Sequence, residues 1–387
     1  MIAAVIGVII ALGALELIMR LLPVREPLET QPVNAANPYL HFKPGRDVLF
    51  SAGWNFEIVN TVRVNNYGFV NDQDYDPHAP TPLLAVIGDS YVEATQVPYG
   101  QAVHGRLAAY AGKRARVYSF ASSGSPLSQY LAYAQFAKDR FHPDGLVIAI
   151  IGNDFDESLL DYKSEPGFHY FKREAAGGFD LALIPFTPSS LHRALRRSAL
   201  ARHIHGNGLL TAATRRLYAL FRGEQAVYVG NVEAQADASR LKESQDAVEY
   251  FLEALPSYSG LRPDRIVFVV DGMRPHLYDA QKLEQAQGSY FGRMREYFMK
   301  AAAARGYAVA DLQPRFLERH AREGIRFEWD IDAHWNAYGH EEAAAAVIAT
   351  AVGQKVLGTG RTQATVADPG RDTLERPQLV TSGRSRP

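Results

Sequence analysis

One stretch decides the fold and points to the chemistry of this chain: Leu83-Leu84-Ala85-Val86-Ile87-Gly88-Asp89-Ser90. Its consecutive apolar residues are typical of a strand buried on both faces, as in a parallel sheet. The next residues, Tyr91 to Ala94, can begin a helix whose first N–H groups are free to bind an anion. Side chains at the carboxyl end of such a strand line the crevice where α/β proteins bind ligands. The sequence therefore places Ser90 where a nucleophile is needed, although serine is also a common helix cap.

A histidine and two acidic residues lie close together far downstream. They belong to Asp330-Ile331-Asp332-Ala333-His334-Trp335-Asn336, which precedes an alanine-rich helical segment. Serine is a good nucleophile only when an imidazole accepts its proton, and a carboxylate on the other ring nitrogen fixes the tautomer. We therefore expect His334 to be the base and Asp332 its orienting acid, with Asp330 as the second candidate. The alternative is a loop histidine followed by a helix cap at Asn336.

Two further apolar strands end in residues that can donate hydrogen bonds. One strand leads into a loop that contains Gly124, and the other, Leu146 to Ile151, ends in Gly152-Asn153-Asp154. A glycine N–H and an asparagine side-chain amide are suitable donors for an oxyanion hole. Gly124 and Asn153 are therefore candidate oxyanion donors, with a purely structural role in each turn as the alternative.

Together the four blocks resemble the SGNH hydrolase superfamily, also called GDSL esterases and lipases, from about Pro82 to Val352. The resemblance implies a flavodoxin-like α/β fold, with a parallel sheet and helices on both faces, and no cofactor. It implies that Ser90 is the nucleophile and His334 the base. It also implies that the Ser90 amide, Gly124 and Asn153 form the oxyanion hole.

Two spacings depart from the usual family pattern. Gly152 directly precedes Asn153, where one residue usually intervenes, and one residue separates Asp332 from His334, where the family usually has two. The Asp-x-His-Trp form is similar to that of membrane-associated SGNH proteins of polysaccharide acetylation systems, which favours Asp332 as the acid. The departures also motivate an alternative, a non-catalytic membrane-anchored interaction subunit of a larger complex.

Four charged residues are predicted to border the pocket because they lie at or near strand ends and the histidine block. They are Asp89, Asp154, Asp330 and Arg274. Arg274 follows a predicted strand that ends at Val270, so it belongs to the same edge of the sheet. It can neutralise an acidic group of the substrate or pair with its neighbour Asp271.

The chain opens with an apolar segment, Met1 to Leu22, in which Glu16 and Arg20 are four residues apart and can pair on one helix face. A helix of this length spans about 33 Å, close to the thickness of a bilayer core. No convincing cleavage site follows, so we expect an uncleaved anchor rather than a signal peptide. Arg20 and Arg25 flank its far end, which by the positive-inside rule argues against export of the following domain. The family resemblance implies the opposite, and we expect an extracytoplasmic catalytic domain.

The remaining chain divides into a linker with a small β appendage (23–81), a hydrolase-like domain (82–352) and a polar tail (353–387) predicted to be disordered. An insertion at about 155–260 leaves the sheet's carboxyl edge and is expected to act as a lid or docking surface. The predicted strands are Leu83–Ile87, Arg116–Phe120, Leu146–Ile151, Arg265–Val270 and Tyr307–Ala310. The predicted helices are Gln101–Gly112, Leu127–Arg140, Ser239–Leu255 and Leu283–Arg305.

Composition excludes several other classes of function. The 41 basic and 42 acidic residues leave a net charge of −1, which does not favour nucleic-acid binding. The absence of cysteine excludes disulfides and thiol nucleophiles, and the histidines show no metal-binding spacing. We therefore expect a serine esterase without metal or cofactor that acts on short acyl esters of a carbohydrate, a cell-envelope polymer or a lipid. The alternative is O-acyl transfer to an envelope polysaccharide through the same acyl-serine. Its expected partners are a membrane, through Met1 to Leu22, and membrane proteins.

Overall fold

The computed structural model describes residues 1–175, 177–189, 196–207, 238–274 and 276–358. Within these residues, a parallel sheet of five strands has the order β4-β3-β5-β8-β9. The strands are β3 (Leu83–Gly88), β4 (Arg116–Ala121), β5 (Gly145–Ile150), β8 (Ile266–Val270) and β9 (Ala308–Asp311). Of the strands in this sheet, β3 comes first along the chain and lies between β4 and β5, as in flavodoxin-like sheets. The predicted α/β fold is confirmed, and each predicted strand is present to within one or two residues.

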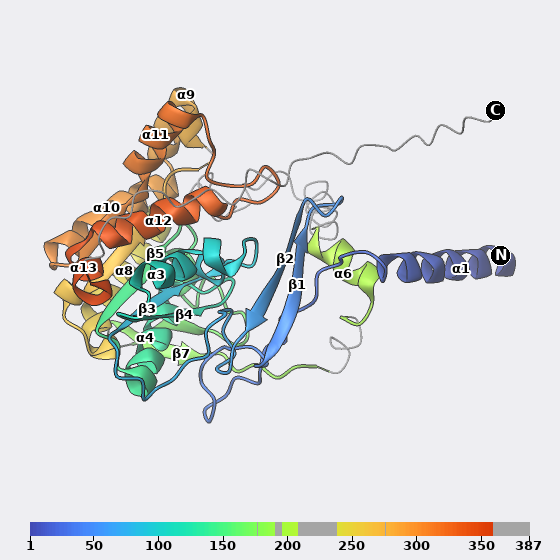
Figure 1. Ribbon diagram of the computed structural model, residues 1–387, viewed down its shortest axis with the longest axis horizontal. Coiled ribbons are helices and arrows are strands. Elements are labelled where there is room, and N and C mark those ends of the chain that lie inside the picture. The colour runs from blue at the N-terminus through green and yellow to red at the C-terminus, as the bar shows by residue number, and fades with distance from the viewer. Residues whose placement is uncertain (176, 190–195, 208–237, 275, 359–387) are drawn as a thin grey trace, which may run out of the picture.

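Helices cover both faces of the sheet because both faces are apolar. In β3, Leu83, Ala85 and Ile87 belong to one buried cluster, and Leu84 and Val86 belong to the other. Helices α4 (Leu127–Phe141), α8 (Ala238–Ser259) and α10 (Tyr290–Ala304) pack on the first cluster. Helices α3 (Val103–Ala111), α11 (Leu312–Glu323), α12 (Ala337–Ala349) and α13 (Ala351–Leu357) pack on the second. The sheet therefore lies between two layers of helices, as Figure 1 shows.

One predicted helix is two separate helices in the structure. The expected helix Leu283–Arg305 is two helices, α9 (Ala280–Gln287) and α10, which are separated at Gly288 and Ser289. The Ser289 side chain accepts a hydrogen bond from the Gly292 N–H at 3.2 Å and so caps the start of α10. A serine that caps its own helix in this way begins a new helix instead of continuing the previous one.

Helix α1 (Ile2–Met19) projects away from the rest of the molecule in Figure 1, and none of its residues is buried. Its length and composition are sufficient to cross a membrane. Glu16 and Arg20 form the expected ion pair, with Arg20 Nε 2.8 Å from Glu16 Oε1.

A short helix, α6 (Ala199–Gly206), lies beside the carboxyl end of α1. The Glu16 carboxylate accepts hydrogen bonds from the Ser198 hydroxyl at 2.8 Å and from the Ala199 and Leu200 N–H groups at 3.0 Å. A carboxylate on these free N–H groups stabilises a helix start. Glu16 therefore joins α1 to the described part of the predicted insertion.

Two antiparallel hairpins lie outside the central sheet. They are formed by β1 (Arg46–Ala52) with β2 (Ile58–Val64), and by β6 (His169–Arg173) with β7 (Phe179–Leu183). The start of the predicted linker, after α1, packs against this region, because Val33 is fully buried and its backbone N–H and C=O bond to Phe186. The predicted disordered tail beyond residue 358 lies outside the described residues, as do parts of the insertion.

Candidate active site

Ser90 stands at the first position of α2 (Ser90–Glu93), immediately beyond the end of β3. The preceding residue, Asp89, caps this helix by accepting a hydrogen bond from the Tyr91 N–H at 2.9 Å. In the described part of the chain, the Ser90 N–H has no hydrogen-bond acceptor. The strand end thus presents both a hydroxyl and a free backbone donor at the edge of the sheet.

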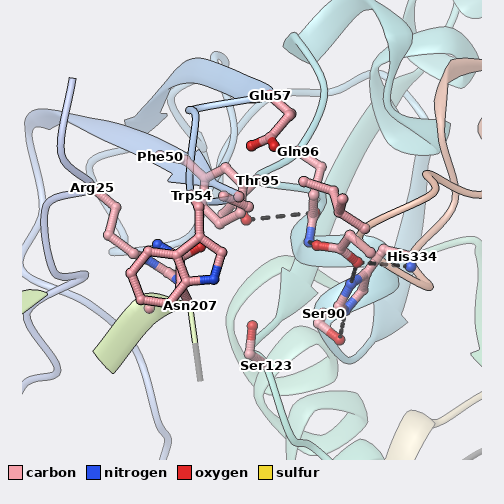
Figure 2. A pocket seen from close by; sticks show the side chains of 15 residues that line it. Arg25, Phe50, Trp54, Glu57, Ser90, Thr95, Gln96, Ser123, Asn207 and His334 are labelled. Carbon is pink, nitrogen blue, oxygen red and sulfur yellow. Dashed lines mark hydrogen bonds and ion pairs between the residues drawn. The ribbon is translucent and has the colours of Figure 1, made fainter. Parts of the chain in front are cut away.

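The His334 ring connects Ser90 to an acidic side chain, as Figure 2 shows. Its Nε2 lies 2.7 Å from Ser90 Oγ, and its Nδ1 contacts Asp332 Oδ1. Asp332 also accepts hydrogen bonds from the His334 N–H at 2.9 Å and from the Gln96 side chain at 3.3 Å. Burial lowers the pKa of His334, but the hydrogen bond and charge of Asp332 outweigh it and the pKa is raised. The arrangement can accept a proton from Ser90 and stabilise the resulting imidazolium.

Buried contacts from β8 and α2 hold the histidine loop in place. The Ala333 carbonyl accepts hydrogen bonds from the Tyr91 hydroxyl and from Arg274 Nη1, both at 2.9 Å. Trp335 is fully buried and donates from Nε1 to Asp271 Oδ1 at 2.8 Å. Arg274 also pairs with Asp271, at 2.5 Å. Arg274 therefore pairs with Asp271, which was one of the two predicted roles, and it stabilises the histidine loop through the Ala333 carbonyl.

The structure differs from the predicted pocket border at all four positions, because neither Arg274 nor the three acidic candidates line the cavity described below. Asp89 is buried as a helix cap, and this burial raises its pKa to about 6. Asp154 is buried and accepts a hydrogen bond from the Ile151 N–H at 2.7 Å, so it shapes the turn after β5. Asp330 has an 88 % exposed side chain. Asp89, Asp154 and Arg274 do follow β3, β5 and β8, but these side chains turn toward the protein, and the Asp330 side chain turns toward solvent.

An ion pair that sequence reasoning missed links the two other predicted oxyanion donors. Lys163 donates to the Gly124 carbonyl at 3.0 Å and pairs with Glu157 at 2.6 Å. Glu157 in turn accepts a hydrogen bond from the Asn153 side-chain amide at 3.4 Å. Gly124 has a φ of +83°, and its N–H has no acceptor among the described residues. Neither Gly124 nor Asn153 belongs to the cavity lining.

A known protein family matches most of this chain. The sequence profile of the family described as GDSL-like Lipase/Acylhydrolase matches residues 84–347, a range that includes all four blocks. The chain belongs to this family. The resemblance recognised from the sequence is thereby confirmed, and the protein is an enzyme of the GDSL hydrolase type.

Several solved structures are similar to this GDSL hydrolase. A member of the lipolytic G-D-S-L family from Veillonella parvula DSM 2008 is 11% identical, with 69% of this chain and 97% of that chain covered and a TM-score of 0.36. The lipase/acylhydrolase from Enterococcus faecalis is 11% identical, with 72% and 96% covered and a TM-score of 0.37. TesA is 16% identical, with 71% and 99% covered and a TM-score of 0.36. No match was found among curated protein sequences.

A buried acid on α2 is a further residue of the GDSL hydrolase site that the sequence did not reveal. Glu93 lies one turn after Ser90 and accepts hydrogen bonds from the Ser123 N–H at 2.8 Å and from the Ser123 hydroxyl at 3.0 Å. Burial raises the pKa of Glu93 to about 7. Because Ser123 immediately precedes Gly124, this contact fixes the loop that carries the predicted oxyanion donor. A lone Glu in a helix gives no signal for such a role.

A cavity of about 570 Å³ opens beside Ser90 and His334 in this GDSL hydrolase. The lining residues that follow β3 and β4 or belong to the histidine loop are called the inner wall: Ser90, Thr95, Gln96, Ser123, Ile331, Asp332 and His334. The lining residues from elements outside the central sheet are called the outer wall: Arg25, Phe50, Ala52, Gly53, Trp54, Glu57, Gly206 and Asn207. Figure 2 shows Arg25, Trp54 and Asn207 gathered across the cavity from Ser90 and His334. The described residues contain no group of three or more His, Asp or Glu side chains that could hold a metal ion.

Proposed function

We propose that this GDSL hydrolase is a serine esterase in which Ser90, His334 and Asp332 form the catalytic triad. The observation that carries this proposal is the 2.7 Å separation between Ser90 Oγ and His334 Nε2. Ser90 attacks the carbonyl carbon while His334 accepts its proton, and His334 returns this proton to the departing alcohol. In the second step, water attacks the carbonyl carbon of the acyl-serine while His334 accepts a proton from this water. His334 then returns the proton to Ser90 Oγ as the acyl group leaves. Asp332 keeps Nε2 free to accept the proton.

The tetrahedral intermediate carries a negative oxygen that needs hydrogen-bond donors. We assign these donors to the Ser90 N–H, the Gly124 N–H and the Asn153 side-chain amide. Two observations support the assignment: neither N–H has an acceptor among the described residues, and the Lys163–Glu157 ion pair joins the turns of Gly124 and Asn153. The same contacts and the position of Ser90 favour a catalytic role over that of a non-catalytic subunit.

We further propose that the substrate is a short acyl ester on a carbohydrate or cell-envelope polymer. The cavity volume falls in the range of small-molecule sites, and the Trp54 side chain on the outer wall is 50% exposed and offers a flat apolar surface. Helix α1, with its exposed apolar side chains, serves as the anchor that places the catalytic domain on the extracytoplasmic side.

The decisive experiment treats the purified full-length protein with p-nitrophenyl acetate and with a serine-directed fluorophosphonate probe. We expect turnover and labelling in the native protein, and a loss of about 10⁵-fold in turnover with no labelling in Ser90→Ala. Ser257→Ala is the matched control, because Ser257 is an exposed residue of α8. Equal labelling of the native protein and Ser90→Ala would overturn Ser90 as the nucleophile.

Acyl transfer is a second candidate that one observation favours. Because Glu16 ties α6 to α1, and Gly206 of α6 belongs to the outer wall, the cavity lies close to the end of the proposed anchor. An enzyme held beside a membrane acyl donor gains effective concentration for transfer. A sugar hydroxyl would then replace water in the second step. Mass spectrometry of an oligosaccharide acceptor distinguishes the two, since hydrolysis releases free acetate alone and transfer adds an acetyl group to the acceptor.

A further inference from the structure

Arg25 is the feature of the outer wall that the proposed esterase chemistry does not use. Its side chain is half-buried and lines the same cavity as Ser90 and His334. Its guanidinium lies 4.8 Å from the centre of the Phe50 ring. Among the described residues, this guanidinium has no ion pair and no hydrogen bond. Within the described part of the chain, the five N–H donors of this arginine therefore remain free toward the cavity.

The position of Arg25 is set by packing and by its backbone rather than by an acidic partner. Arg202 of α6 donates from Nη1 to the Arg25 carbonyl at 2.9 Å. Gly206, at the end of α6, packs so closely that an added Cβ would lie 2.7 Å from Arg25 Cδ. The side chain is therefore confined between α6 and the Phe50 ring, which limits the conformational freedom that a ligand would have to remove.

Neither acidic residue of the cavity lining, Glu57 or Asp332, forms an ion pair or a hydrogen bond with Arg25. Asp332 binds His334 and Gln96, and the exposed Glu57 accepts a hydrogen bond from the Asn55 N–H at 3.1 Å. Burial lowers the pKa of Arg25. The charges of Glu93 and Asp332 raise this pKa by a smaller amount, and neither carboxylate contacts the guanidinium. A partly buried cation without a hydrogen-bonded anion is costly, so the geometry leaves a place for an anion of the ligand.

We infer that Arg25 forms an anion subsite, so that this enzyme acts on esters whose alcohol part carries a carboxylate or a phosphate group. This inference deepens the proposed esterase function and rests on it. The guanidinium binds the two oxygens of the anion side by side. Trp54 and Asn207, on the same wall, contact the neutral part of the alcohol. The ester carbonyl then lies across the cavity at Ser90.

The first test compares kcat/KM for two matched pairs of substrates. One pair is the acetyl ester of methyl glucuronoside and that of methyl glucoside, and the other is acetylglycerol 3-phosphate and acetylglycerol. We expect the native enzyme to prefer the charged member of at least one pair, and Arg25→Gln to lower that preference about tenfold to a hundredfold. Arg25→Lys should retain part of it, because it keeps the charge but not the paired donors. The pair that responds identifies a carboxylate or a phosphate as the ligand.

Arg140→Gln is the matched control, since Arg140 is exposed in the last turn of α4, at the opposite end of the sheet from Ser90. Its charged-to-neutral ratio should equal that of the native enzyme. Thermal unfolding of each variant checks that the fold is retained. An Arg25→Gln ratio equal to the native ratio for both pairs would overturn the subsite.

A second test separates failure of the subsite from failure of the esterase proposal. Calorimetry measures binding of methyl glucuronoside and of glycerol 3-phosphate to full-length Ser90→Ala, with and without Arg25→Gln. A Kd at least tenfold weaker in the double variant supports the subsite even if the native enzyme hydrolyses no ester. Binding that does not depend on Arg25 overturns the subsite even if esterase activity is found.

Discussion

The two walls of the cavity are built in different ways. The inner wall comes from the segments that follow β3 and β4 and from the loop before α12. Hydrogen bonds hold its groups in place: His334 contacts Ser90 and Asp332, and Ser123 contacts the buried Glu93. The outer wall comes from elements outside the sheet, and its main charged group, Arg25, has no such partner in the described part of the chain. Reacting groups must be held rigidly, whereas recognition groups need free donors for the ligand. Under the proposed function, the inner wall supplies the chemistry and the outer wall supplies the selectivity.

After the loss expected for Ser90→Ala, the largest effect is expected at the orienting acid of the inner wall. Asp332→Asn should lower kcat by about 10³-fold to 10⁴-fold, because His334 loses the group that fixes its tautomer and stabilises its charge. Asp330→Asn is the matched control, since the Asp330 side chain is 88 % exposed and should affect kcat less than twofold. Steady-state kinetics with p-nitrophenyl acetate measures both. A larger loss in Asp330→Asn would reassign the orienting acid.

A smaller effect is expected at the oxyanion donor. Asn153→Ala should lower kcat by about 10²-fold to 10³-fold with little change in KM, because the lost hydrogen bond forms in the transition state. Asn207→Ala, on the outer wall, should instead act mainly on KM. The same kinetic assay separates the two patterns. Equal effects on kcat from both substitutions would remove the distinction between the oxyanion donor and the recognition residues of the outer wall.

The pH dependence also tests the inner wall. His334 acts as a base only when neutral, and its pKa is raised, so kcat/KM should be constant above that pKa and fall about tenfold per unit below it. Asp332→Asn removes the group that raises this pKa, so the acidic limb should move to lower pH. Profiles between about pH 5 and pH 9 measure the shift.

Glu93 requires a control in this experiment, because burial raises its pKa to about 7 and its titration overlaps the same range. Glu93→Gln should leave the position of the acidic limb unchanged if His334 is responsible. A limb that disappears in Glu93→Gln, or that does not move in Asp332→Asn, would assign the titration to Glu93.

The smallest effect is expected from the contact that joins the outer wall to α1. Glu16→Gln weakens the cap of α6, a change of about 0.5–2 kcal/mol for a helix cap, and should lower the preference for anionic esters by a fewfold. Glu284→Gln, an exposed position of α9, is the matched control. The charged-to-neutral ratio of kcat/KM measures the change. An unaltered ratio would show that α6 holds Arg25 without help from Glu16.

Local patterns in the sequence were sufficient for the sheet and for the candidate reacting groups. Runs such as Leu83–Ile87 are apolar on both faces, which allows little but a buried parallel strand. Ser90 and His334 follow from their positions next to recognisable elements and from the family pattern. The prediction of one continuous helix over Leu283–Arg305 was wrong because the apolar periodicity continues through Ser289. The helix cap at Ser289 affects only one turn, so the periodicity does not reveal it.

The sequence by itself therefore determined the type and order of the elements and the residues able to do ester chemistry. Only the tertiary structure decided which distant residues share the cavity: Arg25, Trp54 and Asn207 meet opposite Ser90, and Lys163 reaches Gly124. The physical reason is that backbone propensity and apolar periodicity act over a few neighbouring residues. Contacts between residues far apart depend on how whole elements pack, and the lone Arg, Trp and Glu side chains of this site carry no local signal of their partners.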